Sequence, residues 1–275
     1  MTELLSYGFM QRALVAALLV GLTAPAVGVF LVQRRLALMG DGIGHVALTG
    51  VALGYLLGTA PVLTAVVVAA LGAVAIEVMR TRGTSGDVAL ALLFYGGLGG
   101  GVLLIGLAPE GSGATLLAYL FGSLTTVSAS DLVLIAALAA GVLGLLATFG
   151  RELFAVCHDE EHARVAGLRV RALTLMLAVL AAVTVTVAMR VVGLLLVSAL
   201  MVVPVAASQV LARSFRATVV GALAVGTAAS LSGVVLSYRA DVAPGAAIVV
   251  LSLAVFVLCS SAAVLRRWRP GQVPA

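Results

Sequence analysis

Stretches of about twenty consecutive apolar residues, separated by short polar connections, repeat along nearly the whole chain. A helix of about twenty residues spans the hydrocarbon core of a bilayer, whereas a strand of a membrane barrel is about ten residues of alternating polarity. A helix also satisfies its backbone hydrogen bonds within one segment, which lipid requires. The chain is therefore predicted to be an all-α, polytopic transmembrane helical bundle.

Composition supports this prediction. Hydrophobic residues make up 63% of the 275 positions and charged residues only 10%, compared with roughly a quarter charged in ordinary soluble domains. A soluble fold could not cover itself with so little polar surface. The 31 glycines predict helix interfaces at which backbones approach closely.

Eight or nine spans are expected, and charge favours nine. At about twenty residues per span, the helices fall at roughly 10–32, 36–58, 61–80, 87–107, 131–149, 171–189, 191–212, 217–237 and 245–265. The segment between Pro109 and Ser130, which contains Leu116, Leu117 and Tyr119, is too short to cross. We expect it to be a re-entrant or interfacial piece within a single domain, residues 1–275.

All sixteen basic residues are arginines, and most of them lie in the connections between apolar runs. With nine spans, five groups fall on one side of the membrane: Arg34 and Arg35; Arg80 and Arg82; Arg151, Arg164, Arg169 and Arg171; Arg213 and Arg216; Arg266, Arg267 and Arg269. Basic residues mark the cytoplasmic side. The net charge of +5 therefore reports topology and not a nucleic-acid partner, and we expect a multi-pass protein of the bacterial cell (inner) membrane.

The complete absence of lysine excludes one class of function. A Walker A loop needs a Lys to reach the nucleotide phosphates, so this chain cannot be its own P-loop ATPase. Neither a Ser, His and acid set nor an HExxH motif points to an enzyme. Cys157 and Cys259 lie far apart and indicate neither a disulfide nor a thiolate metal site. No permanently bound cofactor is expected.

Asp41 and His45 are the strongest candidates for chemistry. Ionisable residues inside a span cost about 2.5–3.5 kcal/mol each at the helix centre, so those present are functional candidates. A separation of four residues places the two side chains on one helix face. A carboxylate and an imidazole form half a site for a divalent transition metal, with other ligands from another helix, water or a partner protomer. The alternative is that each side chain is satisfied by its neighbours.

Other acidic residues have simpler interpretations. Glu77 lies three residues before Arg80 near a span end, where an ion pair is expected. Asp87 and Asp131 should begin helices, where a negative charge complements the dipole. Asp241 is most simply a turn residue, and the alternative is a gate or metal relay, together with the nearby Tyr238.

The one long polar stretch lies near residues 151–170. Asp159, Glu160 and Glu161 precede Gly167, and the apolar residues Leu153, Phe154, Val156, Val165 and Leu168 are interspersed among them. This pattern predicts a short amphipathic helix on the cytoplasmic face that docks to a partner. A cytosolic metal site at His158 and His162 is the less favoured alternative.

Several blocks in a fixed order resemble the permease of bacterial zinc, manganese and iron ABC importers. The blocks are 28–41 with His45, 50–52, 118–124, 192–200, 204–207, and 236–238 with Asp241, Pro244 and Gly245. Gly44 and Thr49 stand where the family usually has Ser and Pro. The spacing of Glu161 and Gly167 is similar to that of the coupling helix of ABC permeases.

The resemblance implies a passive transport pathway for a divalent metal ion as substrate, within a permease dimer in membrane lipid. It also implies partner subunits: cytoplasmic ABC ATPases and an extracytoplasmic metal-binding protein. Asp41 and His45 would be metal ligands, and Asp159, Glu160, Glu161 and Gly167 would contact the ATPase. A secondary transporter or channel, in which Asp41, His45 and Asp241 relay ions or protons, remains the alternative.

Overall fold

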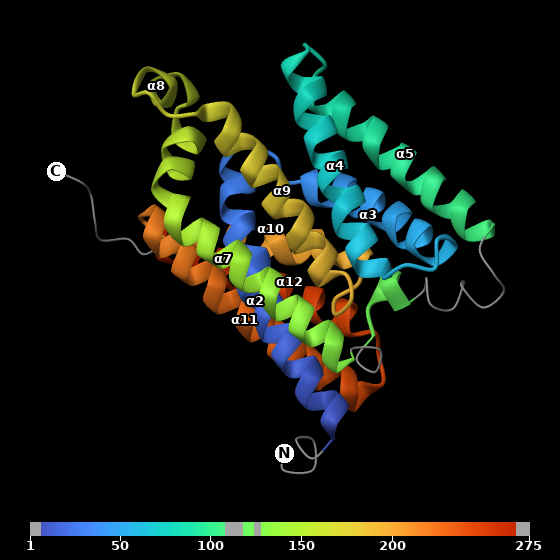
Figure 1. Ribbon diagram of the computed structural model, residues 1–275. Coiled ribbons are helices and arrows are strands. Elements are labelled where there is room, and N and C mark those ends of the chain that lie inside the picture. The colour runs from blue at the N-terminus through green and yellow to red at the C-terminus, as the bar shows by residue number, and fades with distance from the viewer. Residues whose placement is uncertain (1–6, 108–117, 124–127, 268–275) are drawn as a thin grey trace.

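The computed structural model describes residues 7–107, 118–123 and 128–267, which are helical apart from turns and short connections (Figure 1). The helices are α2 (Gly8–Gln33), α3 (Met39–Leu56), α4 (Pro61–Thr81), α5 (Gly86–Gly106), α7 (Ala129–His158), α8 (Glu160–Val165), α9 (Val170–Ala188), α10 (Leu194–Leu211), α11 (Phe215–Ala240) and α12 (Pro244–Arg267). Each of the nine predicted helices is present, with shifted boundaries.

Seven of these helices are long and apolar enough to cross a membrane. The other two long helices in the described part of the chain, α3 and α10, have 18 residues each. Helix α3 contains Asp41, His45 and several glycines, and α10 contains Ser198, Pro204 and Ser208. These two 18-residue helices carry Asp41, His45 and Ser198 of the candidate site, to which α5 also contributes.

Short polar residues begin several helices. Ser85, Ser128 and Ser214 accept hydrogen bonds from the backbone N–H three residues later, at the starts of α5, α7 and α11. Asp131 also accepts from the backbone N–H of Ser128, which completes a capping box. Pro61 begins α4, where its missing N–H costs nothing. These caps explain why the helix boundaries follow the polar connections of the sequence.

Helix α2 lies at the centre of the bundle and packs against α7, α9, α10 and α11. Helix α3 packs against α4 and α5 on the other side of α9 and α10 (Figure 1). The buried face of α2 is built largely from small side chains, such as Ala13, Ala16, Ala17 and Val20, which are fully buried. Small side chains let neighbouring backbones approach closely, as expected for helices that pack in lipid.

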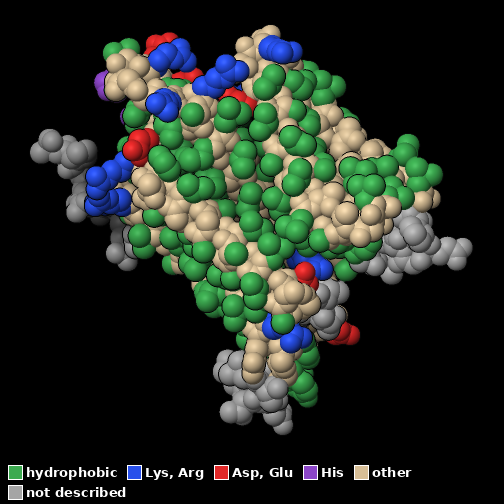
Figure 2. Space-filling model, in the orientation of Figure 1, with side chains coloured by type: hydrophobic (Ala, Val, Ile, Leu, Met, Phe, Trp, Pro, Cys, Tyr) green, Lys and Arg blue, Asp and Glu red, His purple; other side chains and the backbone are tan. Residues whose placement is uncertain are grey.

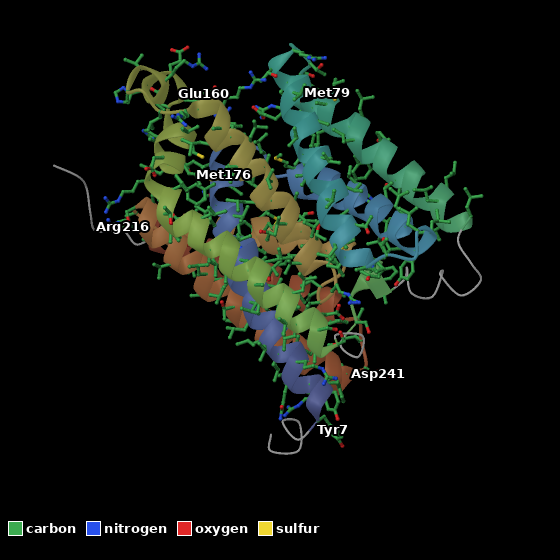
Figure 3. All side chains as sticks on the ribbon, viewed as in Figure 1. Tyr7, Met79, Glu160, Met176, Arg216 and Asp241 are labelled. Carbon is green, nitrogen blue, oxygen red and sulfur yellow. The ribbon has the colours of Figure 1, made fainter. Side chains whose placement is uncertain are left out.

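One end of the bundle gathers the predicted arginine groups, and we call it the arginine-rich end. Arg34 contacts Glu160, Arg35 and Arg80 line one cavity, and Arg151 and Arg216 line another. Figure 3 places Met79, Glu160 and Arg216 on this side, and Tyr7 and Asp241 at the opposite end. The basic side chains along the upper and left margins of Figure 2 show the same asymmetry. The excess of arginine predicts that this end faces the cytoplasm.

The opposite end carries an ion pair between Asp131 and Arg190, whose closest atoms are 2.6 Å apart. The Arg190 guanidinium also lies 5.2 Å from the centre of the Tyr119 ring. Residues 118–121 are helical and Tyr119 is buried, so this part of the segment between α5 and α7 packs into the protein. Leu116 and Leu117, which were predicted to belong to the same piece, lie outside the described residues.

Candidate functional site

The turn between α2 and α3 determines where Asp41 lies. The N–H of Leu36 donates to the carbonyl of Leu31 over 2.8 Å, and the N–H of Arg35 donates to that of Val32 over 3.0 Å. These two bonds form a Schellman motif, with Arg35 in the left-handed conformation at φ 59°. Helix α3 therefore starts only a few residues later, with Asp41 in its first turn. A carboxylate is favourable there because the helix dipole is positive at this end.

Asp41 is held by a neighbouring helix. The hydroxyl of Ser198 on α10 donates a hydrogen bond to the Asp41 carboxylate. The Asp41 side chain remains partly accessible and lines a cavity of about 280 Å³. Asp87, in the first turn of α5, lines the same cavity together with the apolar residues Leu38, Leu90, Ala91, Phe94 and Tyr95. Two carboxylates from different helices thus border one space.

His45 lies one helical turn further along α3 and is only 7% exposed. Its ring meets Phe94 edge to face, with the ring centroids 4.4 Å apart. The buried Nδ1 atom has no hydrogen-bond partner. Gly97 of α5 packs directly on the His45 backbone, since a Cβ at position 97 would lie 2.7 Å from the His45 carbonyl carbon. The His45 backbone is therefore closely packed, and its buried ring lies against Phe94 with Nδ1 unpartnered.

Within the described residues, no three His, Cys, Asp or Glu side chains form a group that could hold a metal ion alone. Asp41 and His45 supply one oxygen and one nitrogen donor on the same face of α3, while Ser198 and Asp87 lie beside Asp41, and His45 does not share the cavity lining with them. Buried polar atoms normally have partners. A donor set of this kind suits transient coordination of a divalent ion that completes its shell with water or a second chain.

Tyr238 and Asp241 lie elsewhere. Asp241 ends α11 in the left-handed conformation at φ 52°, as expected for a turn residue. Tyr238 packs against Tyr7 and Phe9, with ring centroids 6.5 and 6.3 Å away. Figure 3 shows Asp241 beside Tyr7, at the end of the bundle opposite to Glu160. The structure therefore does not bring these two residues to Asp41 and His45.

The predicted amphipathic helix is shorter than expected. Helix α7 continues to His158, nine residues beyond the predicted limit of 149, and only α8, of six residues, stands apart. Asp159 separates the two helices because its backbone is extended and its carboxylate accepts from the N–H of His162 over 2.9 Å. Leu153 and Val156 consequently belong to the buried face of α7. Val165 at the end of α8 is 87% exposed.

Gly167 ends α8 as predicted for a C-terminal cap. Its φ is 80°, and its N–H donates to the carbonyl of Arg164 over 3.1 Å. The N–H of Leu168 donates to the carbonyl of Ala163 over 3.0 Å, so the turn is a second Schellman motif. Glu161 is exposed on α8.

Arg34 connects α8 to the body of the protein. Its guanidinium donates to the Thr174 hydroxyl of α9 over 2.6 Å and to the Glu160 carboxylate of α8 over 3.0 Å. The Arg34 side chain is only 9% exposed, whereas that of Glu160 is 45% exposed, so the contact with Thr174 is the more buried of the two. Glu160 also accepts from Arg164 over 3.2 Å. Because Arg34 is the C-cap of α2, the position of α8 is fixed to the turn that precedes Asp41.

Three of these residues could not be assigned to their contacts from the sequence. Ser198 is a small polar residue in an apolar run, and only the packing of α10 on α3 brings it to Asp41. Asp87 is a helix-start residue by sequence, and its place beside Asp41 depends on the packing of α5 against α3. Arg34 belongs to a basic group that indicates topology. Only its burial could have identified it, and burial depends on the tertiary fold.

Residues 6–263 match the family described as the ABC 3 transport family. Among its relatives are the manganese transport system membrane protein MntC of Halalkalibacterium halodurans (32% identical over 257 residues, covering 93% of this chain and 88% of the relative) and the manganese import system permease protein ScaB of Streptococcus parasanguinis (33% over 255 residues, 92% and 90%). A probable iron transport system membrane protein of Haemophilus influenzae is 32% identical over 257 residues, covering 93% of this chain and 94% of that protein.

The fold agrees with a solved structure of PsaBC from Streptococcus pneumoniae in complex with Fab. The TM-score is 0.86 at 30% sequence identity, and the alignment covers 96% of this chain and 98% of that one. Both the sequence match and the structural match span almost the full chain. This protein therefore belongs to the ABC 3 transport family, as a multi-pass membrane permease and not an enzyme.

Proposed function

We propose that this chain is the permease of an importer that moves a divalent first-row metal ion across the bacterial cell membrane, with energy from a separate cytoplasmic ABC ATPase. The observation that carries the proposal is the pair formed by the Asp41 carboxylate and the unpartnered Nδ1 of His45, on one face of a short helix inside the bundle. Ionisable groups at membrane depth mark ion pathways.

The donor atoms favour a metal that accepts both oxygen and nitrogen. Carboxylates and water suit Mn²⁺, and imidazole suits Zn²⁺ and Fe²⁺. Asp41 offers oxygen atoms on the helix face that carries His45, the Ser198 hydroxyl binds Asp41, and Asp87 borders the Asp41 cavity. This oxygen-rich set supports Mn²⁺ as the first substrate to test, with Fe²⁺ and Zn²⁺ as the others. Relatives named for manganese and iron transport agree with that order.

The proposed importer also contains partner subunits. Helix α8 projects at the arginine-rich end, its exposed Val165 offers an apolar contact, and Glu160 ties it to Arg34. We assign residues 151–170, including Asp159, Glu160, Glu161 and Gly167, as the segment that contacts the ATPase. An extracytoplasmic metal-binding protein would deliver the ion to the opposite end, and a second permease chain would supply the remaining ligands.

The test is uptake of radioactive Mn²⁺ by cells that lack their own importers and express this chain with its ATPase and binding protein. Asp41→Asn and His45→Ala should each reduce uptake at least ten-fold, since each removes a ligand. Asp241→Asn also replaces a carboxylate by an amide, but at the end of the bundle opposite to the arginine-rich end and away from Asp41. It is the matched control and should leave uptake near normal. Normal uptake in both site variants would refute the assignment of the metal site.

The role of the ATPase needs a separate arm. Replacing the Walker A lysine of the partner ATPase removes its phosphate contact and should abolish uptake by the unaltered permease. Uptake that continues with the inactive ATPase, and that follows an imposed proton gradient, would instead identify a secondary transporter. Equilibrium binding of Mn²⁺ to the purified permease separates loss of the site from loss of coupling.

A further inference from the structure

A cavity of about 730 Å³ lies between α2, α7 and α11, at the arginine-rich end and away from the metal site. Most of its lining is apolar, and the apolar residues are Ala26, Phe30, Leu143, Leu146, Ala147, Phe154, Phe215, Val219 and Leu223. Part of this lining is accessible, since Ala147 on α7 is exposed. The cavity is therefore a groove on the side of the bundle and not an internal void.

The polar part of the lining is cationic. Arg151 of α7 and Arg216 of α11 both line the cavity and are both exposed. Neither forms an ion pair with an acidic residue in the described part of the chain, and no carboxylate lines the cavity. Ser214, the N-cap of α11, also lines it. Two free guanidinium groups and a positive helix end thus border one apolar space.

Three aromatic rings line the groove beside these charges. Phe215 lies between Phe30 and Phe154, with ring centroids 5.6 and 4.5 Å away. On α7, Gly150 contributes open space to the groove, because a Cβ at this position would meet nothing within 4 Å. The groove therefore combines an apolar wall with a cationic rim.

We propose that this groove binds an anionic glycerophospholipid of the cytoplasmic leaflet, with its phosphate at Arg151 and Arg216 and one acyl chain along the apolar wall. Helices α7 and α11 are largely unburied within the protein over their apolar windows, so their outer faces meet lipid. A soluble partner cannot reach apolar surface at that depth. Basic pockets between spanning helices on the cytoplasmic side suit anionic headgroups, and this leaflet carries anionic lipid.

The first test measures lipid selectivity by native mass spectrometry of the purified protein, titrated with phosphatidylglycerol or phosphatidylcholine that has the same acyl chains. The unaltered protein should retain phosphatidylglycerol preferentially. Each charge near the surface contributes about 1 kcal/mol, or about five-fold in affinity. Arg151→Gln and Arg216→Gln should therefore each weaken phosphatidylglycerol binding about five-fold, and Arg213→Gln, an exposed arginine outside the groove, should not change it.

The second test fills the groove. Gly150→Leu places a side chain in the open space and should remove phosphatidylglycerol retention without loss of thermal stability. Gly144→Leu is the matched control, since position 144 is equally open but does not line the cavity. Equal retention of the two lipids by the unaltered protein would overturn the proposal. Unchanged retention in the double arginine variant, or in Gly150→Leu, would also overturn it.

Discussion

Replacing Gly167 by valine tests whether the shape of α8, and not only its charge, matters for coupling. No atom lies within 4 Å of a Cβ built at this position, so valine meets no steric clash outside the backbone. The cost comes from its φ of 80°. A residue other than glycine held in this region costs about 1–3 kcal/mol. Because α8 has only six residues, few other hydrogen bonds support the Schellman motif at its end. A cost of about 2 kcal/mol shifts the local equilibrium about 30-fold toward an unwound α8.

The assay is co-purification of the ATPase with the permease, followed by metal uptake in reconstituted vesicles. Gly167→Val should lose most ATPase association while membrane insertion and Mn²⁺ binding stay normal. Gly167→Asn is the matched control because asparagine tolerates the left-handed conformation, and it should retain association. Equal association of the ATPase with the two variants would show that the turn at Gly167 does not position the docking segment.

Four further outcomes follow from the structure. Arg34→Gln removes both hydrogen bonds of the Arg34 guanidinium, so metal uptake should fall. A thermal-unfolding assay should show a loss of about 1.5–3 kcal/mol in the free energy of unfolding. Unchanged uptake would contradict a role of Arg34 in coupling. Arg35→Gly should leave the Tm unchanged or higher, whereas Arg35→Val should lower it, because φ is 59° there. Asp131→Asn keeps the helix cap but removes the ion pair with Arg190 and should cost about 1–2 kcal/mol by the same unfolding assay. Finally, the purified chain should hydrolyse no ATP, since it contains no lysine; hydrolysis by a contaminant-free preparation would contradict this.

The helices were predictable because lipid imposes a simple rule on sequence. An apolar run of about twenty residues must be a helix, so each of the nine ranges was confirmed within a few residues at most of its ends. The largest error was at α7, which continues through Arg151 to His158. The count of about twenty apolar residues per span predicted an end near 149, but a helix continues past the membrane surface until a cap such as Asp159 ends it.

The candidate site was only partly predictable. The spacing of Asp41 and His45 placed both on one face of a helix, because i and i+4 residues are neighbours whatever the tertiary fold. Ser198 lies 157 residues from Asp41 in the sequence, and no local pattern reports such a contact. Asp87 and Arg34 were assigned to a helix start and to topology. Their place beside the site and beside α8 arises from packing between helices, which a single sequence does not encode locally.

The central position of α2 has a consequence for biosynthesis. Of the described helices α2 is synthesised first, yet its apolar window has the largest buried share of the seven candidate spans, and its neighbours include α10 and α11, which are synthesised much later. Spanning helices insert first and associate afterwards. During synthesis α2 must therefore remain in lipid without α10 and α11 until these two helices are inserted, and Arg34 has no Glu160 partner until α8 is made. Two of the later helices, α10 and α11, therefore complete the packing around α2.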